Sequence, residues 1–333
     1  MRKRSIIQMA LIGIFAGALT ALVAVFIPWL PDAAADEAGP IDKVYWVTTI
    51  ISVVIFGVVA GVSIYAVFKF RARPGDEEDG SPIHGHTGLE IVWTAVPTAL
   101  VTAITVYSGV VLTQIEDLPA EHRVVEVTAQ QFAWSFNYPD LDMPASGELW
   151  LPIGETVELK ITSRDVIHAF WVPEWRQKKD AVPGVETNLV VTPSKRGQFD
   201  VVCTELCGLG HSIMRAKAVV VDRPDFERWV EERKQAAEAG GAAQGAELFA
   251  SQGCGSCHVL ADAGSTGQIG PDLDEVLAGK DSAFVRESIV EPDAVIADGY
   301  QPGVMPPNYG DVLSDAQLDG LVDYLLQATN QGG

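Results

Sequence analysis

The four cysteines of this chain fall into two close pairs, and a histidine follows each pair within four residues. Cys203 and Cys207 are four positions apart, and Cys254 and Cys257 are three positions apart. Thiolates and imidazoles at such short spacings are typical of metal or haem ligands, not of a disulfide framework spread along the chain. The sequence therefore predicts two separate redox-active centres.

The second pair belongs to a Cys-x-x-Cys-His run, Cys254-Gly-Ser-Cys257-His258. In such a run the two thiols attach haem covalently, and the adjacent histidine binds one axial face of the iron. A thioredoxin-like motif would need a βαβ context that is absent here. Met305, the single methionine in residues 215–333, is the candidate for the second axial ligand, although a loop methionine can also serve packing alone. Met/His ligation raises the haem potential, which suits an electron acceptor.

Soft donor groups also gather around the first pair. Within twelve residues the chain offers two thiolates, an imidazole and a thioether: Cys203, Cys207, His211 and Met214. Such donors select copper or iron–sulfur over hard cations, whereas zinc has no use for a thioether and a disulfide would leave the other two groups without a role. We therefore predict copper. His168, which would otherwise be a core histidine in an apolar strand, is the candidate for a fourth side-chain donor.

Apolar stretches precede both centres in the chain. They lie at residues 5–30, 44–68 and 89–112. The last two are long enough to cross a bilayer as helices. Because Arg2–Arg4 and Lys69–Arg73 are basic, the positive-inside rule predicts that the N-terminus and the 69–88 loop face the cytoplasm and that everything beyond residue 113 lies outside.

The first apolar stretch has two interpretations. Its basic start and the small residues Ala33-Ala34-Ala35 resemble a signal peptide with a cleavage site, but the apolar run is long for a signal. Residues 1–35 are therefore either a cleaved signal peptide or an extra transmembrane helix. Residues 36–115 form the predicted transmembrane hairpin in both cases.

The exported part divides into two predicted domains and a connection. Short runs rich in β-branched and aromatic residues, beginning at 123, 155, 188, 197 and 216, indicate a β-sandwich or barrel over residues 120–225. Residues 226–243 are predicted as a polar helix followed by a flexible Gly/Ala-rich linker. Residues 244–333 read as a helical domain, with helix start signals at Asp281-Ser282 and Ser314-Asp315.

The net charge of −21 in 333 residues argues against nucleic-acid binding. More than half of it comes from residues 244–333, in which fourteen acidic residues face only Lys280 and Arg286, a net charge of −12. This domain either has an ordinary solvated acidic surface or attracts a basic redox partner.

The motifs together resemble one family. Besides His168 and the 203–214 run, the matching segments are Leu89-Glu90-Ile-Val-Trp93-Thr94-x-x-Pro97, Gln131-Phe-Ala-Trp134-Ser135 and Lys179-Asp180-Ala-Val-Pro183-Gly184. They resemble cytochrome c oxidase subunit II. Residues 244–333, with the turn Gly270-Pro271-Asp272-Leu273, are similar to a class I cytochrome c domain, as in caa-type haem–copper oxidases with a fused haem domain.

The resemblance implies a multi-domain membrane protein with a transmembrane helical hairpin, a cupredoxin-like β-barrel and a small all-α cytochrome c domain. It also implies a binuclear copper A centre in which Cys203 and Cys207 bridge two coppers. His168 and His211 would bind one copper each, Met214 would be a weak ligand, and the backbone carbonyl of Glu205 would complete the set. The Glu205 side chain would point toward a magnesium ion shared with subunit I.

The implied function is electron transfer from a donor through haem c and copper A to haem in subunit I, where oxygen is reduced with proton pumping. Glu90 would lie near a proton path, although a carboxylate at a membrane interface is also ordinary. Phe132 stands where the family usually has the electron-accepting tryptophan, and Trp134 matches a second, structural tryptophan. His84 and His86, like His122, are expected to be solvated.

The implied partners are subunits I and III, with cytochrome c or a cytochrome bc-type complex as donor. The implied location is the bacterial cytoplasmic membrane, with both redox domains on its outer face. Two alternatives remain open: a nitric-oxide reductase with a copper A subunit, and a membrane-tethered electron carrier without an attached enzyme.

Overall fold

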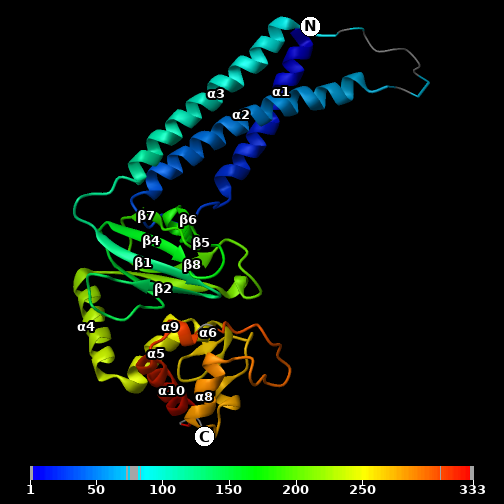
Figure 1. The fold of residues 1–333 in the computed structure, drawn as a ribbon. Coiled ribbons are helices and arrows are strands. Elements are labelled where there is room, and N and C mark those ends of the chain that lie inside the picture. Colours follow the sequence, from blue (N-terminus) through cyan, green and yellow to red (C-terminus); the bar gives the residue numbers. More distant parts are fainter. Residues whose placement is uncertain (1–2, 73, 76–81, 83, 308, 331–333) are drawn as a thin grey trace. The chain divides into compact units, whose positions relative to one another are not determined.

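A computed structural model describes residues 3–72, 74–75, 82, 84–307 and 309–330 (Figure 1). Arg2 and Arg73, two of the basic residues used to predict sidedness, lie outside the described residues. The chain separates into two compact units. The first comprises Met1–Pro31 and Gly39–Glu116, and the second comprises Asp32–Ala38 and Asp117–Gly333.

The first unit contains three long apolar helices, α1 (Lys3–Phe26), α2 (Ala38–Phe70) and α3 (Thr87–Ile115). Each is long and apolar enough to cross a membrane, with mean hydropathies of 2.4, 2.5 and 1.8. The second and third are longer than the apolar stretches at 44–68 and 89–112, because polar residues at their ends continue the helical backbone.

Glycines mark the contact between α1 and α2. A β-carbon on Gly13 would lie 2.7 Å from the carbonyl oxygen of Gly57, and one on Gly61 would lie 2.5 Å from the carbonyl oxygen of Met9. Gly13 and Gly17 form a Gly-x-x-x-Gly pair on α1, as Gly57 and Gly61 do on α2. Small residues at this spacing let two membrane helices approach closely.

The second unit begins with a β-barrel of nine strands. They are β1 (Arg123–Gln130), β2 (Ala133–Asn137), β3 (Leu149–Pro152), β4 (Val157–Ser163), β5 (His168–Trp171), β6 (Lys178–Ala181), β7 (Thr187–Val191), β8 (Gly197–Cys203) and β9 (Arg215–Val221). One sheet has the order β2-β1-β4-β7, and the other has the order β3-β9-β8-β5-β6. Trp134, Phe170 and Leu151 are among the fully buried core side chains. This is the predicted cupredoxin-like domain.

The segment before α2 is built into this barrel. Ala35 forms a β-bridge with Pro193, the amide of Ala34 donates to the carbonyl of Glu174, and the amide of Ser194 donates to the carbonyl of Ala34. Ala34 is fully buried. Two of the three alanines that resemble a signal-peptide cleavage site, Ala34 and Ala35, are therefore packed into the barrel, whereas Ala33 is exposed.

Helix α4 (Arg223–Ala239) packs on the outside of the barrel. Its Trp229 stacks on Trp150 of β3, with ring centroids 5.2 Å apart, and Tyr138 meets Trp229 edge to face. A single residue, Gly240, separates the end of α4 from the start of helix α5 (Gly241–Ser251). The flexible linker expected within 226–243 is thus reduced to Gly240, because the Ala-rich segment after it continues as helix.

The remaining elements form the small helical domain. They are α6 (Cys254–Cys257), β10 (Val259–Leu260), β11 (Ser265–Thr266), α7 (Leu273–Val276), α8 (Ser282–Val290), α9 (Tyr309–Val312) and α10 (Asp315–Asn330). The side chain of Asp281 caps α8 by accepting from the amide of Phe284, and Ser314 and Gln317 form a reciprocal cap at α10. Both predicted helix starts are confirmed.

Candidate metal centre

Two strands of one sheet bring the predicted copper ligands together. His168 is the first residue of β5, and Cys203 is the last residue of β8. Phe170 pairs with Cys203 across these antiparallel strands, so His168 lies beside the end of β8. The chain then forms a loop, which we call the copper loop (residues 203–214), and returns as β9. Its last part is a 3₁₀ turn, His211–Ile213.

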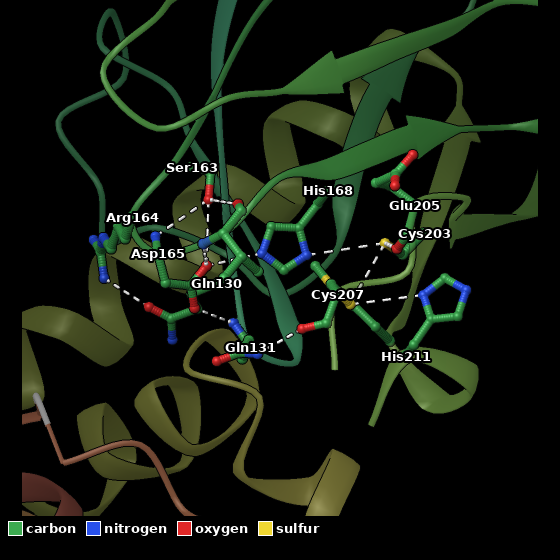
Figure 2. Close-up of polar contacts among 12 residues, drawn as sticks. Gln130, Gln131, Ser163, Arg164, Asp165, His168, Cys203, Glu205, Cys207 and His211 are labelled. Atoms are coloured by element: carbon green, nitrogen blue, oxygen red, sulfur yellow. Dashed lines mark hydrogen bonds and ion pairs between the residues drawn. The ribbon is translucent and has the colours of Figure 1, made fainter. Parts of the chain in front are cut away.

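Figure 2 shows the donor atoms of this site converging. The Sγ atoms of Cys203 and Cys207 are 3.8 Å apart. Around them, His168 Nδ1 lies 3.9 Å from Cys203 Sγ, His211 Nδ1 lies 3.6 Å from Cys207 Sγ, Met214 Sδ lies 3.8 Å from Cys207 Sγ, and the Glu205 carbonyl oxygen lies 3.3 Å from Cys203 Sγ. All six residues predicted as copper ligands are therefore near one another.

The two sulfurs fit a shared metal and not a disulfide. A disulfide needs a separation of about 2.05 Å, whereas two metal–sulfur bonds of about 2.3 Å each can span up to about 4.6 Å. Both cysteines are free and buried, and His168 and Met214 are fully buried. Two thiols, two imidazoles and a thioether, all buried except the half-buried His211, are the donor chemistry that copper prefers.

Hydrogen bonds and burial set the protonation of these groups before metal binds. Burial alone would raise the pKa of the Cys203 thiol, but hydrogen bonds with His168 and with the backbone of Ala169 outweigh it and lower the pKa to about 6. Burial lowers the pKa of His168, yet its bonds to Asp165 and Cys203 raise it to about 8. Burial and the adjacent Cys203 raise the pKa of Cys207 to about 12. Metal binding at neutral pH must therefore release protons.

Asp165 fixes the orientation of the His168 ring through the nitrogen that faces away from the sulfurs. Its Nε2 lies 2.8 Å from Asp165 Oδ1, which leaves Nδ1 directed toward the sulfurs (Figure 2). A carboxylate behind a ligand histidine fixes the tautomer and the ring orientation. Sequence reasoning missed Asp165, although its position three residues before His168 was a usable signal.

Two aromatic residues, Phe132 and Trp134, lie near the predicted copper ligands. Phe132 is buried, and its ring lies so close to Gly210 that a β-carbon there would overlap it. Trp134 meets His168 edge to face, with ring centroids 6.2 Å apart, and meets Phe170 at 5.5 Å. Phe132 therefore contacts the copper loop, and Trp134 contacts the ring of His168.

The helical domain has the features that a haem iron and its attachment need. The thiols of Cys254 and Cys257 are free and lie on one turn of α6. His258 Nδ1 lies 2.9 Å from the carbonyl oxygen of Pro271, so Nε2 is the nitrogen left for iron. Burial lowers the pKa of His258, which favours the neutral imidazole that a metal requires. Met305 packs against the core of this domain.

Glu90 has a structural partner at the start of α3. Its Oε1 accepts from the amide of His86 at 2.9 Å, while His86 Nδ1 accepts from the amide of Leu89 at 3.1 Å. This reciprocal arrangement caps the helix. His86 is thus a capping residue, His84 is exposed, and His122 lies 3.6 Å from Glu158.

The implied magnesium site finds no support in this chain. Among the described residues, His168, Cys203 and Cys207 form the one group of three or more His, Cys, Asp or Glu side chains with converging donor atoms. The carboxylate of Glu205 is not part of such a group.

Comparison with known proteins places three segments in known families. Residues 18–111 match the cytochrome c oxidase subunit II transmembrane domain, and residues 143–222 match the periplasmic domain of the same subunit. Residues 242–329 match the cytochrome c family. The matches follow the order of the helices, the barrel and the helical domain.

Several curated relatives are similar over most of the chain. Cytochrome c oxidase subunit 2 of Alkalihalophilus pseudofirmus is 29% identical, covering 88% of this chain and 89% of its own. That of Bacillus subtilis is 30% identical, covering 85% and 88%, and that of Thermostichus vulcanus is 33% identical, covering 63% and 80%. The chain therefore belongs to the cytochrome c oxidase subunit II family and carries a C-terminal cytochrome c domain.

Proposed function

We propose that this chain is the electron-transfer subunit of a terminal oxidase. The observation that carries the proposal is the pairing, in one chain, of two sites. One is a site of two thiols, two imidazoles and a thioether in a cupredoxin-like barrel, and the other is a Cys-x-x-Cys-His motif in a cytochrome c domain. When bound, haem c and binuclear copper A supply the two redox centres that pass electrons from a donor to haem in subunit I. There oxygen is reduced to water with proton pumping; this chain reduces none.

The residues of the chain suit the copper centre to fast electron transfer. Cys203 and Cys207 hold their sulfurs 3.8 Å apart inside a strand-bounded loop, and Met214 is fully buried beneath them. His168 is bonded on its far side to Asp165, so its ring is not free to turn. Donors that are already in place and packed need little movement when the charge of the site changes.

The proposed partners are subunits I and III, with cytochrome c or a cytochrome bc-type complex as donor. The proposed location is the bacterial cytoplasmic membrane, with the barrel and the haem domain on the outer face. Three apolar helices and the match to a periplasmic family domain support this orientation. A nitric-oxide reductase remains the second candidate, because the catalytic chemistry would lie in the partner.

The test is purification of the assembled complex followed by metal analysis and gas uptake. We expect the chain to co-purify with a large haem–copper subunit that consumes oxygen. Cys203→Ser should abolish the two-copper signal, because one thiolate cannot bridge two metals, whereas Met214→Leu should retain copper with a shifted potential. Retention of two coppers in the cysteine variant would refute the copper assignment, and uptake of nitric oxide without oxygen would favour the second candidate.

We propose in addition that Glu90 lies on a path of proton uptake, as the match of its Leu-Glu-x-x-Trp motif suggests. The capping bond to His86 offers a purely structural explanation, and two variants separate the two roles. Glu90→Gln keeps an acceptor oxygen for the His86 amide but cannot carry a proton, whereas Glu90→Ala removes both functions.

If Glu90 carries protons, both variants slow oxygen turnover several-fold, while the rates of haem c and copper reduction stay at the wild-type values. If Glu90 only caps α3, the glutamine variant turns over like wild type, and only the alanine variant loses stability, by about 0.5–2 kcal/mol. Steady-state oxygen uptake together with stopped-flow reduction of the same preparations decides between them.

A further inference from the structure

The turn between β1 and β2 carries a side chain that touches both halves of the copper site. We propose that Gln131, in this turn, is a positioning residue of the copper centre, which ties the segment that holds His168 to the loop that holds Cys207. This inference rests on the proposed function, since it concerns the geometry of the copper ligands.

The first contact runs through the backbone of Gln131. Its amide donates to Asp165 Oδ2 at 2.7 Å. The other oxygen of the same carboxylate, Oδ1, lies 2.8 Å from His168 Nε2 and accepts from the amide of Val166 at 2.7 Å. Because both carboxylate oxygens are occupied, Asp165 cannot turn without releasing either the histidine or the β1–β2 turn.

The second contact runs through the side chain of Gln131. Its Nε2 donates to the backbone carbonyl of Cys207 at 2.5 Å (Figure 2). The next residue of the loop, Gly208, has a φ of +134°, and a β-carbon there would lie 2.7 Å from Gln131 Nε2. The close approach of the amide to the copper loop therefore depends on glycine at position 208.

Packing reinforces this arrangement. The ring of Phe132 covers Gly208 and Gly210, so the turn lies against the copper loop through two successive residues. The neighbouring Gln130 points elsewhere, because its Oε1 accepts from Arg164 Nη1 at 3.0 Å. Gln131 is thus the residue of this turn that contacts both the Asp165 carboxylate and the Cys207 backbone.

The two ligand segments come from different parts of the chain, and β5 and β8 pair only at Phe170 and Trp171. Beyond that short ladder, one further backbone bond joins the segments, from the amide of Thr204 to the carbonyl of Ala169 at 3.0 Å. The separation between His168 and Cys207 also depends on side-chain contacts such as that of Gln131. Outer contacts that orient ligands change metal affinity by roughly 10–100-fold when they are removed. Loss of the Gln131 amide should therefore alter the copper centre without removing any ligand.

The test compares Gln131→Met with a matched control in the intact, metal-loaded complex. Methionine keeps the length of the side chain and removes its N–H donor, while the backbone bond to Asp165 remains. Gln198→Met makes the same change at an exposed position of β8 in the same barrel. For each variant we would measure copper stoichiometry, the copper hyperfine pattern in electron paramagnetic resonance, the midpoint potential, and copper loss to a chelator.

We expect Gln131→Met to retain two coppers, to show a changed hyperfine pattern and potential, and to lose copper to the chelator about 10-fold faster or more. Gln198→Met should match wild type. An unchanged spectrum, potential and rate in Gln131→Met would overturn the proposal, as would equal changes in both variants. A wild-type complex without a two-copper spectrum would instead refute the proposed function itself. Thermal unfolding of each variant separates a shifted centre from a destabilised barrel.

Discussion

Gly270 has no donor side chain, yet it controls the space beside the histidine of the haem motif. A β-carbon at this position would lie 2.5 Å from Cε1 and 2.7 Å from Nδ1 of His258. The ring can therefore reach the carbonyl of Pro271 only because residue 270 has no side chain. Glycine is the residue that allows such a close approach of backbone to a ligand.

We predict that Gly270→Ala displaces the His258 ring and weakens its axial bond to iron, while Cys254 and Cys257 still attach haem. The expected result is a normal covalent haem content with a shifted midpoint potential and altered absorption bands. Substitution of Gly303 or Gly279 would strain the backbone, because these glycines have φ values of +74° and +69°. The control is therefore Ser288→Ala, on α8.

Wild-type absorption and potential in Gly270→Ala would show that the ring tolerates the methyl group and that the packing argument is wrong. Haem staining of denatured protein measures attachment separately from axial ligation. If Gly270→Ala contained no covalent haem, Gly270 would be needed for haem attachment and not only for the axial bond of His258.

The ligand-bearing residues could be predicted from the sequence, because donor chemistry and spacing are local properties. The sequence offered a usable signal for Asp165, three residues before His168, but none for Gln131, because the role of Gln131 depends on which turns the barrel brings together. Glu90 shows the same limit: its motif suggested proton chemistry, but the reciprocal bonds with His86 appear only in the folded helix start. Residue type alone does not reveal a hydrogen-bond partner.

At the scale of elements, the contact between α1 and α2 bears on the fate of residues 1–35. We propose that α1 is retained as a third transmembrane helix. The Gly-x-x-x-Gly pair of α1 packs against that of α2 so closely that a β-carbon on either Gly13 or Gly57 would overlap the backbone of the other helix. A leader that is cleaved off would not need this packing.

This proposal predicts that Gly57→Leu destabilises the membrane part of the chain, because the leucine side chain would collide with the backbone of α1. Gly109→Leu on α3 is the matched control, since a β-carbon at that position has no neighbour within 4 Å. Intact-mass measurement of the purified wild-type chain should find residues 1–35 present. Thermal unfolding in detergent should then show a lower midpoint for Gly57→Leu than for Gly109→Leu.

A mature chain that begins near residue 36, together with equal unfolding midpoints of the two leucine variants, would contradict the proposal and identify α1 as a signal peptide. Because Gly57 lies in α2, the substitution does not change the leader sequence itself.

The barrel strands differed in how well the sequence marked them. The runs beginning at 123, 155, 188, 197 and 216 correspond to β1, β4, β7, β8 and β9, which contain several β-branched residues and, except for the five-residue β7, span seven or eight residues. Strands β3, β5 and β6 span four residues each, too short for alternation to be visible, and the first four residues of β2 are all buried, so that β2 shows no alternation either. The linker was predicted too long, because the glycines at 240 and 241 indicate a flexible segment, whereas α5 begins at Gly241.

At the scale of the whole chain, the boundary between the barrel and the haem domain can be drawn from packing. Phe226, Trp229 and Val230 of α4 belong to the buried core of the barrel, and Arg233 Nη2 donates to the carbonyl of Ala145 at 3.0 Å. A cut within α4 would therefore damage the barrel. Truncation after Gly240 removes the haem domain while it keeps the whole of α4.

The fused haem domain has two consequences for electron delivery. A covalently connected donor acts at an effective concentration that can reach the millimolar range, so in the proposed electron path delivery to copper would not depend on diffusion of a separate protein. The barrel also has Phe132 where the family usually has tryptophan, which is consistent with a reduced need for direct docking. The acidic haem domain, with a net charge of −12, would then recognise a basic donor.

We predict that truncation after Gly240 leaves the copper spectrum intact but slows copper reduction by a basic soluble cytochrome c by about 10²-fold. The rate for the full-length protein should fall steeply between low and high salt, because a Debye length of about 10 Å at 0.1 M screens the acidic domain. The truncated protein should show a much weaker salt dependence. Stopped-flow reduction of both forms at two ionic strengths measures these rates. Equal rates for the two forms would mean that the barrel accepts electrons directly and that Phe132 is a sufficient point of contact.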